Sequence, residues 1–309
     1  MKTVFMGTPD FAVPVLDAMI KAGHEVGYVI TQPDKARNRG KQVQFTPVKE
    51  LAVANNIEVL QPRKIKESPE TVELLKAYNP DIIVVVAYGQ IIQKEILELP
   101  KYGCVNVHAS LLPKLRGASP IQHAILVGEE KSGVTIMQMG EGLDTGDMLT
   151  KVSTPVGNKN GEELHDELSQ LGAKLLVDTL TLIEEDMVTP EPQDDSLSTY
   201  AGMISKADGK IDFSKKPVEI ERQIRAFDPW PGAYCDFNGA TMKIWKAQVP
   251  GKNCESPAGT IVDFGNDGID VSCGGEILRI TELQMPGKKR MTADAFLRGN
   301  KIEKDTVLG

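Results

Sequence analysis

Short β-branched runs alternate with helical patterns through the first half of the chain, and this alternation limits the possible folds more than any other feature. Such an alternation is typical of βαβ units, in which the strands form a parallel sheet. The runs are apolar almost throughout, as expected for strands that helices cover on both faces. The predicted strands are residues 3–6, 25–31, 58–61, 81–87, 103–108 and 134–139.

Two helical segments of this first half have clear boundaries. The segment SPETVELLKAY begins with Ser68 as a helix N-cap and Pro69 at the first helical position. Residues 161–185 carry a long amphipathic pattern, and we expect this helix to close the first domain. The sequence therefore predicts an α/β domain with a parallel sheet over residues 1–186.

The second part of the chain has a different composition. A length of 309 residues exceeds the roughly 100 to 200 of a typical domain, so two domains are expected. The segment MVTPEPQDDSLS combines prolines with acidic and small polar residues, which predicts an interdomain linker over residues 187–206. After it, one amphipathic helix precedes short strand patterns that glycine and asparagine interrupt. This pattern predicts a small antiparallel barrel over residues 207–309.

The composition argues against several classes of protein. With 41% hydrophobic and 25% charged residues, it is that of an ordinary soluble globular protein. No apolar run approaches the roughly 18 residues of a membrane-spanning helix, and the first residues reach glycine and proline too early for a signal peptide. We therefore expect a cytoplasmic protein with no membrane partner. The four cysteines show no CxxC pairing and no histidine at metal-binding spacing, so we expect reduced thiols and no metal site.

The net charge of -8 is unevenly distributed. Residues 207–309 contain 15 Lys and Arg against 15 Asp and Glu, so residues 1–206 carry the whole excess. A charge run on its own is often a solvated loop without a partner. The basic run KARNRGK follows the second predicted strand, however, so it should project from the carboxyl edge of the sheet, where ligands of open α/β sheets bind. Its four cations are Lys35, Arg37, Arg39 and Lys41.

The predicted strand GCVNVHAS carries polar side chains close to its end. Side chains alternate across a strand, so Cys104, Asn106 and His108 share one face. Asn106 and His108 therefore meet near the carboxyl end of the strand, which is the ligand-binding end of an open parallel sheet. The alternative for an Asn-x-His pattern on its own is a pair of hydrogen-bonded polar residues at a strand end.

Two further segments follow this strand. In SLLPKLRGASP, Pro113 and Gly117 force the chain into a loop with exposed backbone donors and the cation Arg116. Such a loop can hold a planar polar ligand, and it can also be a plain connection to the next helix.

In MGEGLDTGDML, three glycines surround Asp144, so its carboxylate could turn back toward His108. The alternative is an ordinary glycine-rich turn with local hydrogen bonds.

Asn106, His108 and Asp144 together suit acyl transfer to an amine. The developing oxyanion needs a hydrogen-bond donor, which Asn106 or protonated His108 could supply. The amine must lose a proton and the leaving nitrogen must gain one, which suits a histidine oriented by a carboxylate or a carboxylate acting through water. The sequence has no GxSxG nucleophile motif, so direct attack by the amine is the expected mechanism.

Five segments make the chain similar to a known family. They are GTPDFAVPVL, NVHASLLPKLRGASPIQHAI, GLDTGDML, TYAGMISKADGKIDF and FDPWPGAY, and they extend over essentially the whole chain. On these motifs the chain resembles the folate-dependent formyltransferases, in particular those that formylate the initiator Met-tRNA. The pattern of Asn106, His108 and Asp144 is shared by all of these formyltransferases, whereas the motifs after the predicted linker narrow the choice.

The resemblance implies a Rossmann-like formyltransferase domain followed by an OB-like domain that binds tRNA. It implies initiator Met-tRNA as the substrate, 10-formyltetrahydrofolate as the formyl donor and catalysis by Asn106, His108 and Asp144; we expect no metal and a monomer. The tetrahydrofolate contact is assigned to Ser110, Leu111, Leu112 and Pro113. The loop with Lys35, Arg37, Arg39 and Lys41 is assigned to the acceptor end of the tRNA.

The chain departs from the family pattern at two places. Gly140 stands where the family often has aspartate, which should loosen the turn without affecting Asp144. The basic loop has Ala36 and Asn38 where the family usually has a proline and an additional glycine. Asparagine tolerates the left-handed backbone that such a turn requires, so the turn can be retained.

Two alternatives follow from the same residues. One is a formyltransferase for another amine, such as glycinamide ribonucleotide or a nucleotide-linked amino sugar; a second domain and the FDPWPGAY motif argue against it. The other is a non-catalytic RNA-binding protein whose α/β domain is a relic, that is, a domain that has lost its catalytic activity. The intact set of Asn106, His108 and Asp144 argues against a relic.

Overall fold

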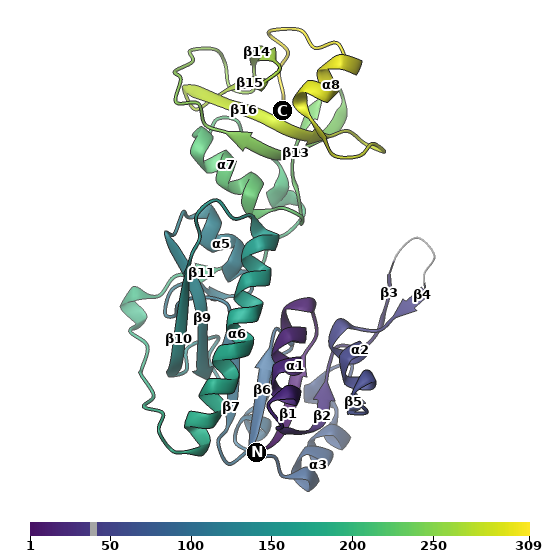
Figure 1. Cartoon of the computed structure of the whole chain (residues 1–309), viewed down its shortest axis with the longest axis vertical. Helices are drawn as coiled ribbons and strands as arrows, with labels where there is room; N and C mark the ends of the chain where they lie inside the picture. The colour runs from purple at the N-terminus through teal and green to yellow at the C-terminus, as the bar shows by residue number, and fades with distance from the viewer. Residues whose placement is uncertain (38–41) are drawn as a thin grey trace. The chain divides into compact units, whose positions relative to one another are not determined.

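The computed structural model describes residues 1–37 and 42–309 (Figure 1). The chain divides into two compact units. Unit 1 consists of Met1–Pro120, Lys131–Pro155 and His165–Ala201, and unit 2 consists of Ile121–Glu130, Val156–Leu164 and Gly202–Gly309. Most of the segment 187–206, for which we predicted a linker, therefore lies within unit 1.

Unit 1 is built around a seven-stranded sheet with the strand order β10-β9-β7-β6-β1-β2-β5. The five strands from β7 to β5 run parallel, as the sequence predicts. All six predicted strands are present, with ends that differ by a few residues at most. The strands of the sheet are β1 (Lys2–Gly7), β2 (Glu25–Ile30), β5 (Glu58–Leu60), β6 (Ile82–Val86), β7 (Cys104–His108), β9 (Lys131–Gln138) and β10 (Met148–Pro155).

The last two strands differ from the expectation of a fully parallel sheet. β9 pairs antiparallel with β7, and β10 pairs antiparallel with β9. The connection from β7 to β9 includes the seven-residue helix α5 (Pro120–Leu126). The apolar run of β9 is compatible with either direction, and its pairing with β7 is antiparallel. The edge strand β10 lacks an apolar run because several of its side chains are polar and partly exposed, which is why the sequence did not reveal it.

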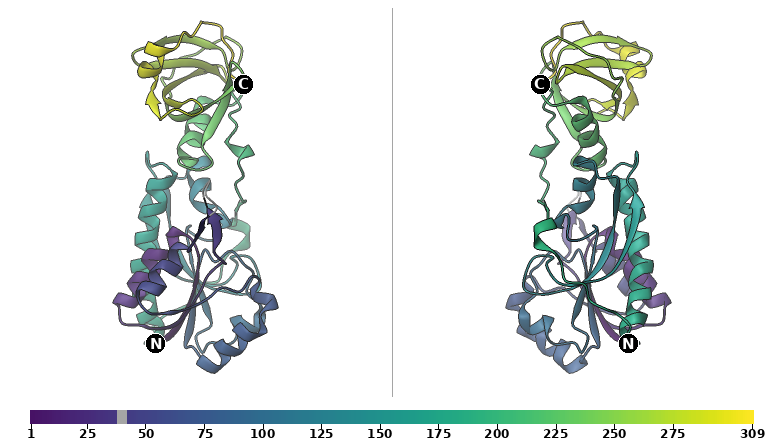
Figure 2. Two further views of the ribbon diagram at one scale, coloured as in Figure 1. Left: turned by 90° about the vertical axis from the view of Figure 1, so that its right-hand side faces the viewer. Right: turned by 90° about the vertical axis from the view of Figure 1, so that its left-hand side faces the viewer.

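Helices cover both faces of this sheet (Figure 2). On one face, Val4 and Met6 of β1 belong to the same buried cluster as Val72 and Leu75 of α3. On the other face, α6 lies so close that a Cβ atom at Gly172 would be 2.9 Å from the side chain of Val107. The helices of the first 200 residues are α1 (Val13–Lys21), α2 (Pro47–Ala54), α3 (Pro69–Tyr78), α4 (Lys94–Leu97), α5 and α6 (Gly161–Glu184).

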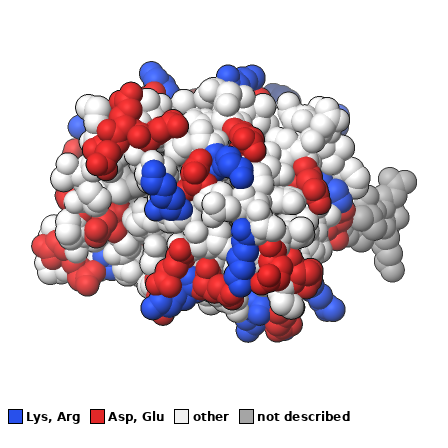
Figure 3. Space-filling view, turned by 90° about the horizontal axis from the view of Figure 1, so that it is seen from below, with Lys and Arg blue, Asp and Glu red and all other residues white. Residues whose placement is uncertain are grey.

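The predicted boundaries of two helices are confirmed. The helix α3 begins at Pro69 with Ser68 as its N-cap residue, although the Ser68 hydroxyl donates to Glu70 Oε1 at 2.5 Å instead of accepting from the helix backbone. The helix α6 begins at Gly161, as its amphipathic pattern indicates. On the face of unit 1 shown in Figure 3, acidic and basic side chains are interspersed.

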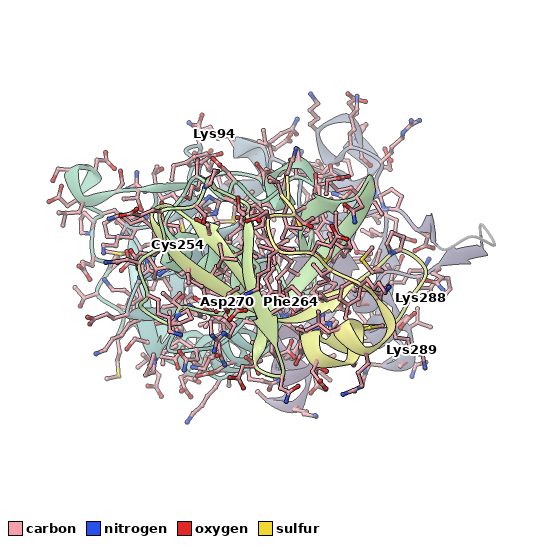
Figure 4. The ribbon with its side chains drawn as sticks, turned by 90° about the horizontal axis from the view of Figure 1, so that it is seen from above. Lys94, Cys254, Phe264, Asp270, Lys288 and Lys289 are labelled. Carbon is pink, nitrogen blue, oxygen red and sulfur yellow. The ribbon has the colours of Figure 1, made fainter. Side chains whose placement is uncertain are left out.

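Unit 2 contains an antiparallel sheet with the order β12-β13-β16-β15-β14, and β17 pairs with β16. The antiparallel architecture is confirmed, but the pairings among the described strands do not close the sheet into a barrel. Ile220 and Ile224 of α7 pack on its buried face. Lys288 and Lys289, in the loop between β16 and β17, lie close to α8 (Figure 4). The elements are α7 (Pro217–Ala226), α8 (Ala293–Gly299), β12 (Ala233–Phe237), β13 (Ala240–Gln248), β14 (Ile261–Gly265), β15 (Gly268–Cys273), β16 (Glu276–Gln284) and β17 (Met291–Thr292).

Candidate active site

Strand β7 places Asn106 and His108 at its carboxyl end, between the parallel neighbour β6 and the antiparallel neighbour β9. Asn106 pairs with Val85 of β6 and with Met137 of β9. His108 is buried, with 5% of its surface exposed, while Asn106 is partly buried. The two side chains share one face of the strand, as the period of two requires.

Asp144 comes from the turn that follows β9, and it meets both of these residues. Its Oδ1 accepts a long hydrogen bond from Asn106 Nδ2 at 3.5 Å, and its Oδ2 lies 3.8 Å from His108 Nδ1. Oδ2 also accepts a hydrogen bond from the backbone N–H of Gly117 at 2.8 Å. The structure therefore brings the three predicted catalytic residues together from two separate segments.

The imidazole of His108 is held by a backbone group. Its Nε2 lies 3.0 Å from the carbonyl oxygen of Leu115, which can only accept a hydrogen bond. Nε2 therefore carries the proton in the neutral ring, and Nδ1 has the lone pair that faces Asp144. The ring therefore has its unprotonated nitrogen, Nδ1, on the side of Asp144.

The glycines around Asp144 have different roles. A Cβ atom at Gly146 would lie 1.8 Å from the carbonyl oxygen of Gln138, so this position has no room for a side chain. At Gly140, no atom lies within 4 Å of an added Cβ. Asp144 itself has a left-handed backbone with φ 52, which aspartate tolerates better than most residues. The turn therefore requires glycine at position 146, whereas a side chain would fit at position 140.

The four residues assigned to tetrahydrofolate lie in the loop after β7. The hydroxyl of Ser110 donates to the carbonyl oxygen of Lys114 at 2.7 Å, and the backbone N–H of Leu112 donates to Thr135 Oγ1 at 3.2 Å. Ser110 and Leu112 are buried, and Leu112 packs in a small cluster with two methionines. The side chains of Leu111 and Pro113 are partly exposed, so these two have apolar surface to offer a ligand.

The guanidinium of Arg116 bonds to other side chains of the protein, whereas the sequence suggested a cation available to a ligand. Its Nε donates to Gln193 Oε1 at 3.0 Å, and its Nη2 lies 2.7 Å from Asp195 Oδ1. The short parallel strands β8 (Arg116–Gly117) and β11 (Tyr200–Ala201) pair nearby. No apolar pattern marks the segment around Gln193, so its contacts with the site could not be found from the sequence.

The basic loop is described only in part. Arg39 and Lys41 lie outside the described residues, whereas Lys35 and Arg37 belong to β3 (Lys35–Arg37), which pairs antiparallel with β4 (Gln42–Gln44). At the base of this ribbon, Asp34 forms an ion pair with Lys49 and accepts a hydrogen bond from Gln61 at 2.8 Å. Burial opposes ionisation of Asp34, but these hydrogen bonds outweigh burial and lower its pKa.

The thiol nearest to the site is chemically inert. Cys104 shares its strand face with Asn106, and burial raises its pKa to about 12. A thiolate nucleophile is therefore scarce at neutral pH. In the described part of the chain, His, Cys, Asp and Glu form no group of three that is arranged to hold a metal ion. None of the helices in that part of the chain combines the length and the apolarity that a membrane span requires.

The sequence matches two models of one protein family. Residues 1–180 match the formyl transferase model, and residues 203–301 match the model of the formyl transferase C-terminal domain. The chain is 50% identical over 310 residues to the methionyl-tRNA formyltransferase of Clostridioides difficile, with full coverage of both chains. It is 46% identical to the methionyl-tRNA formyltransferase of Geobacter sulfurreducens, covering 100% of this chain and 97% of the relative.

Solved structures show the same fold at lower identity. An N-formyltransferase from Helicobacter canadensis, solved with folinic acid and dTDP-3-aminofucose, matches with a TM-score of 0.68 and 22% identity over 92% of this chain and 99% of that one. A methionyl-tRNA formyltransferase from Clostridium thermocellum matches with a TM-score of 0.55 and 18% identity over 90% and 99%. With both family models matched in chain order and relatives about half identical over the full length, the chain belongs to the formyl transferase family.

Proposed function

We propose that this protein transfers the formyl group of 10-formyltetrahydrofolate to the amino group of methionine on initiator Met-tRNA. The observation that carries the proposal is the meeting of Asn106, His108 and Asp144 at the carboxyl end of β7, in a chain that matches methionyl-tRNA formyltransferases along its full length. The folate supplies the formyl group. The protein supplies an amide donor, an imidazole with one available nitrogen, and a carboxylate that faces this nitrogen.

Each of the three side chains has one task in this reaction. Asn106 donates a hydrogen bond from Nδ2 to the oxygen on which negative charge develops when the amine attacks the formyl carbon. His108 receives the proton of the attacking amine at Nδ1, since Nε2 is committed to the Leu115 carbonyl oxygen. Asp144 stabilises the imidazolium that results. The proton then returns from Nδ1 toward the leaving nitrogen of the folate as its bond to the formyl carbon breaks.

Other parts of the chain bind the folate and the tRNA. Ser110, Leu111, Leu112 and Pro113 form the tetrahydrofolate contact, for which the partly exposed Leu111 and Pro113 provide apolar surface. Residues 1–186 act as the catalytic domain and residues 207–309 as the tRNA-binding domain; residues 187–206 act as the linker between them, although most of this segment belongs to unit 1. The enzyme acts as a monomer in the cytoplasm, where translation is initiated.

A comparison of acceptors tests the substrate. The protein is incubated with 10-formyltetrahydrofolate and, separately, with charged initiator tRNA, glycinamide ribonucleotide or a nucleotide-linked amino sugar. We expect formyl transfer to the charged tRNA alone, measured by mass spectrometry of the released aminoacyl group and of the two small amines. Formylation of either small amine in preference to the tRNA would establish one of the alternatives, and no transfer to any acceptor would support a binding protein.

The basic loop gives a second prediction, which concerns tRNA binding. Replacing Lys35, Arg37, Arg39 and Lys41 with alanine should weaken tRNA binding at low salt and leave folate binding unchanged. Each phosphate contact contributes about 0.7 to 0.9 to the slope of log affinity against log salt, so four contacts account for a slope of about -3. The measurement is tRNA affinity across a salt series.

A variant with the same change in charge provides the control. Lys21, Lys64, Lys66 and Lys101 are exposed lysines of unit 1 outside the loop, and their joint replacement with alanine also removes four positive charges. We expect this control to keep a salt dependence close to that of the unmodified protein. Parallel slopes for the loop variant and the unmodified protein would mean that the loop has no role in tRNA binding.

A further inference from the structure

We propose that Gln193 is a positioning residue for formyl transfer, which holds the Asp144 turn in the geometry that the reaction requires. The inference rests on the catalytic role proposed for Asp144. Gln193 lies in the segment that follows α6, far from Asp144 in the sequence, and its side-chain hydrogen bonds go to Asp144, Gly146 and Arg116, not to Asn106 or His108. It acts on the site through the backbone of the turn.

Both polar atoms of the Gln193 side-chain amide form hydrogen bonds. Its Nε2 donates to the carbonyl oxygen of Asp144 at 2.9 Å and to the carbonyl oxygen of Gly146 at 2.7 Å. Its Oε1 accepts from Arg116 Nε at 3.0 Å. Both protons and the oxygen therefore have partners, and two of the three partners are backbone groups of the turn that carries the carboxylate.

These contacts join the two loops that define the position of Asp144. The backbone N–H of Gly117, next to Arg116, donates to the Asp144 carboxylate at 2.8 Å, and the carbonyl oxygen of Leu115 holds His108. Thr199, six residues after Gln193, supports the same loop by accepting from the backbone N–H groups of Leu115 and Arg116, both at 2.9 Å. Gln193 thus links the turn of the carboxylate to the loop that holds the imidazole.

The turn needs such support because its backbone can adopt more than one conformation. Asp144 has a left-handed φ of 52, and an added Cβ at Gly140 would touch nothing within 4 Å. Glycine adds conformational freedom on the side where the turn is open. The two hydrogen bonds from Gln193 restrict the backbone on either side of Thr145 and so reduce the conformations available to the carboxylate.

Loss of the support from Gln193 should slow the chemical step of the reaction. The distance of 3.8 Å between Asp144 Oδ2 and His108 Nδ1 matters most when the imidazole is protonated, which happens during the reaction. A displaced carboxylate therefore lowers the stability of the transition state more than that of the bound substrates. A displacement of about 1 Å at such a site can cost about 10²-fold in rate.

The test is Gln193→Glu, compared with Asp195→Asn as a matched control. The first change keeps the length of the side chain and an acceptor for Arg116, but it replaces the two N–H donors with an oxygen that repels the carbonyl oxygens of Asp144 and Gly146. The second removes the charge of the other partner of Arg116, a carboxylate with 83% of its side chain exposed, and leaves the turn untouched. We expect kcat to fall about tenfold to 10²-fold for Gln193→Glu, with both KM values within about threefold, and to change less than about twofold for Asp195→Asn.

A double-mutant cycle separates positioning from general destabilisation. In the background of Asp144→Asn, the further change Gln193→Glu should lower the single-turnover rate by less than about twofold, because no carboxylate remains to be positioned. Losses that multiply in the double mutant, or a defect in KM alone, would overturn the inference. If Gln193→Glu does not fold, Gln193→Met, which has a similar volume and adds no charge, takes its place with the same expectations.

The cycle also tells two failures apart. If Asp144→Asn leaves kcat unchanged, the catalytic role of Asp144 is wrong, and the positioning role is wrong with it. If Asp144→Asn lowers kcat and Gln193→Glu does not, the catalytic role stands and only the inference about Gln193 is wrong.

Discussion

Asp144→Asn is expected to lower kcat by about 10³- to 10⁴-fold while the protein stays folded and binds folate normally. The amide has the shape of the carboxylate and can still accept the hydrogen bond from the Gly117 N–H, so the turn should keep its place. It carries no charge, however, and cannot stabilise a protonated His108. The measurement is single-turnover formyl transfer with enzyme in excess, together with folate affinity and thermal unfolding.

The same substitution three residues further along gives a control for Asp144→Asn. Asp147 contributes its backbone carbonyl to a hydrogen bond with the N–H of Gln138, and Asp147→Asn leaves that group unchanged. We expect this variant to retain most of its activity. A defect of Asp144→Asn that appeared only in the KM for folate would make Asp144 a binding residue and contradict its role with His108.

Asn106→Ala is expected to lower the rate by about 10²- to 10³-fold, as the loss of one oxyanion donor does in other acyl-transfer enzymes. The 3.5 Å contact between Asn106 Nδ2 and Asp144 is long, so this amide can turn a proton toward the substrate oxygen at little cost. Folate binding and the melting temperature should change little. Rates are compared under single-turnover conditions, where substrate association does not contribute.

Cys104→Ala is the control for Asn106→Ala, because Cys104 lies on the same face of β7 and is fully buried. This change removes one atom from the core below the site and leaves the donors in place. It should destabilise the protein slightly and preserve the rate. An Asn106→Ala variant with more than about half of the original activity would remove Asn106 from the mechanism.

The sequence predicts the parallel part of the sheet because buried strands have a simple signature. Strands such as Ile82–Val86 are apolar at every position, as expected for strands that are covered on both faces. The sequence also brings Asn106 and His108 together, since a period of two is a local property of a strand. The expectation that Asp144 would turn back toward His108 depended on the glycines around it, and Gly146 is the one that the turn requires.

Other features depend on contacts between distant segments. The antiparallel direction of β9 is a matter of its pairing with β7, which the apolar pattern of β9 does not reveal. Arg116 looks like a cation available to a ligand until Gln193 and Asp195 are placed beside it. These partners are separated from Arg116 by 77 and 79 residues, and local sequence patterns carry no information about such pairs.

The hydrogen bond between His108 and the carbonyl oxygen of Leu115 makes the tautomer of the imidazole depend on the length of the loop between the two residues. The acceptor is a backbone atom seven residues along the chain, so no exchange of a side chain at position 115 can take it away. An insertion or deletion between the two residues moves that oxygen and releases the ring to adopt its other tautomer, with the proton on the nitrogen that should receive one. The number of residues in this loop therefore determines which nitrogen acts as the base, and an engineer who shortens or lengthens it alters acid–base chemistry without replacing an acid or a base.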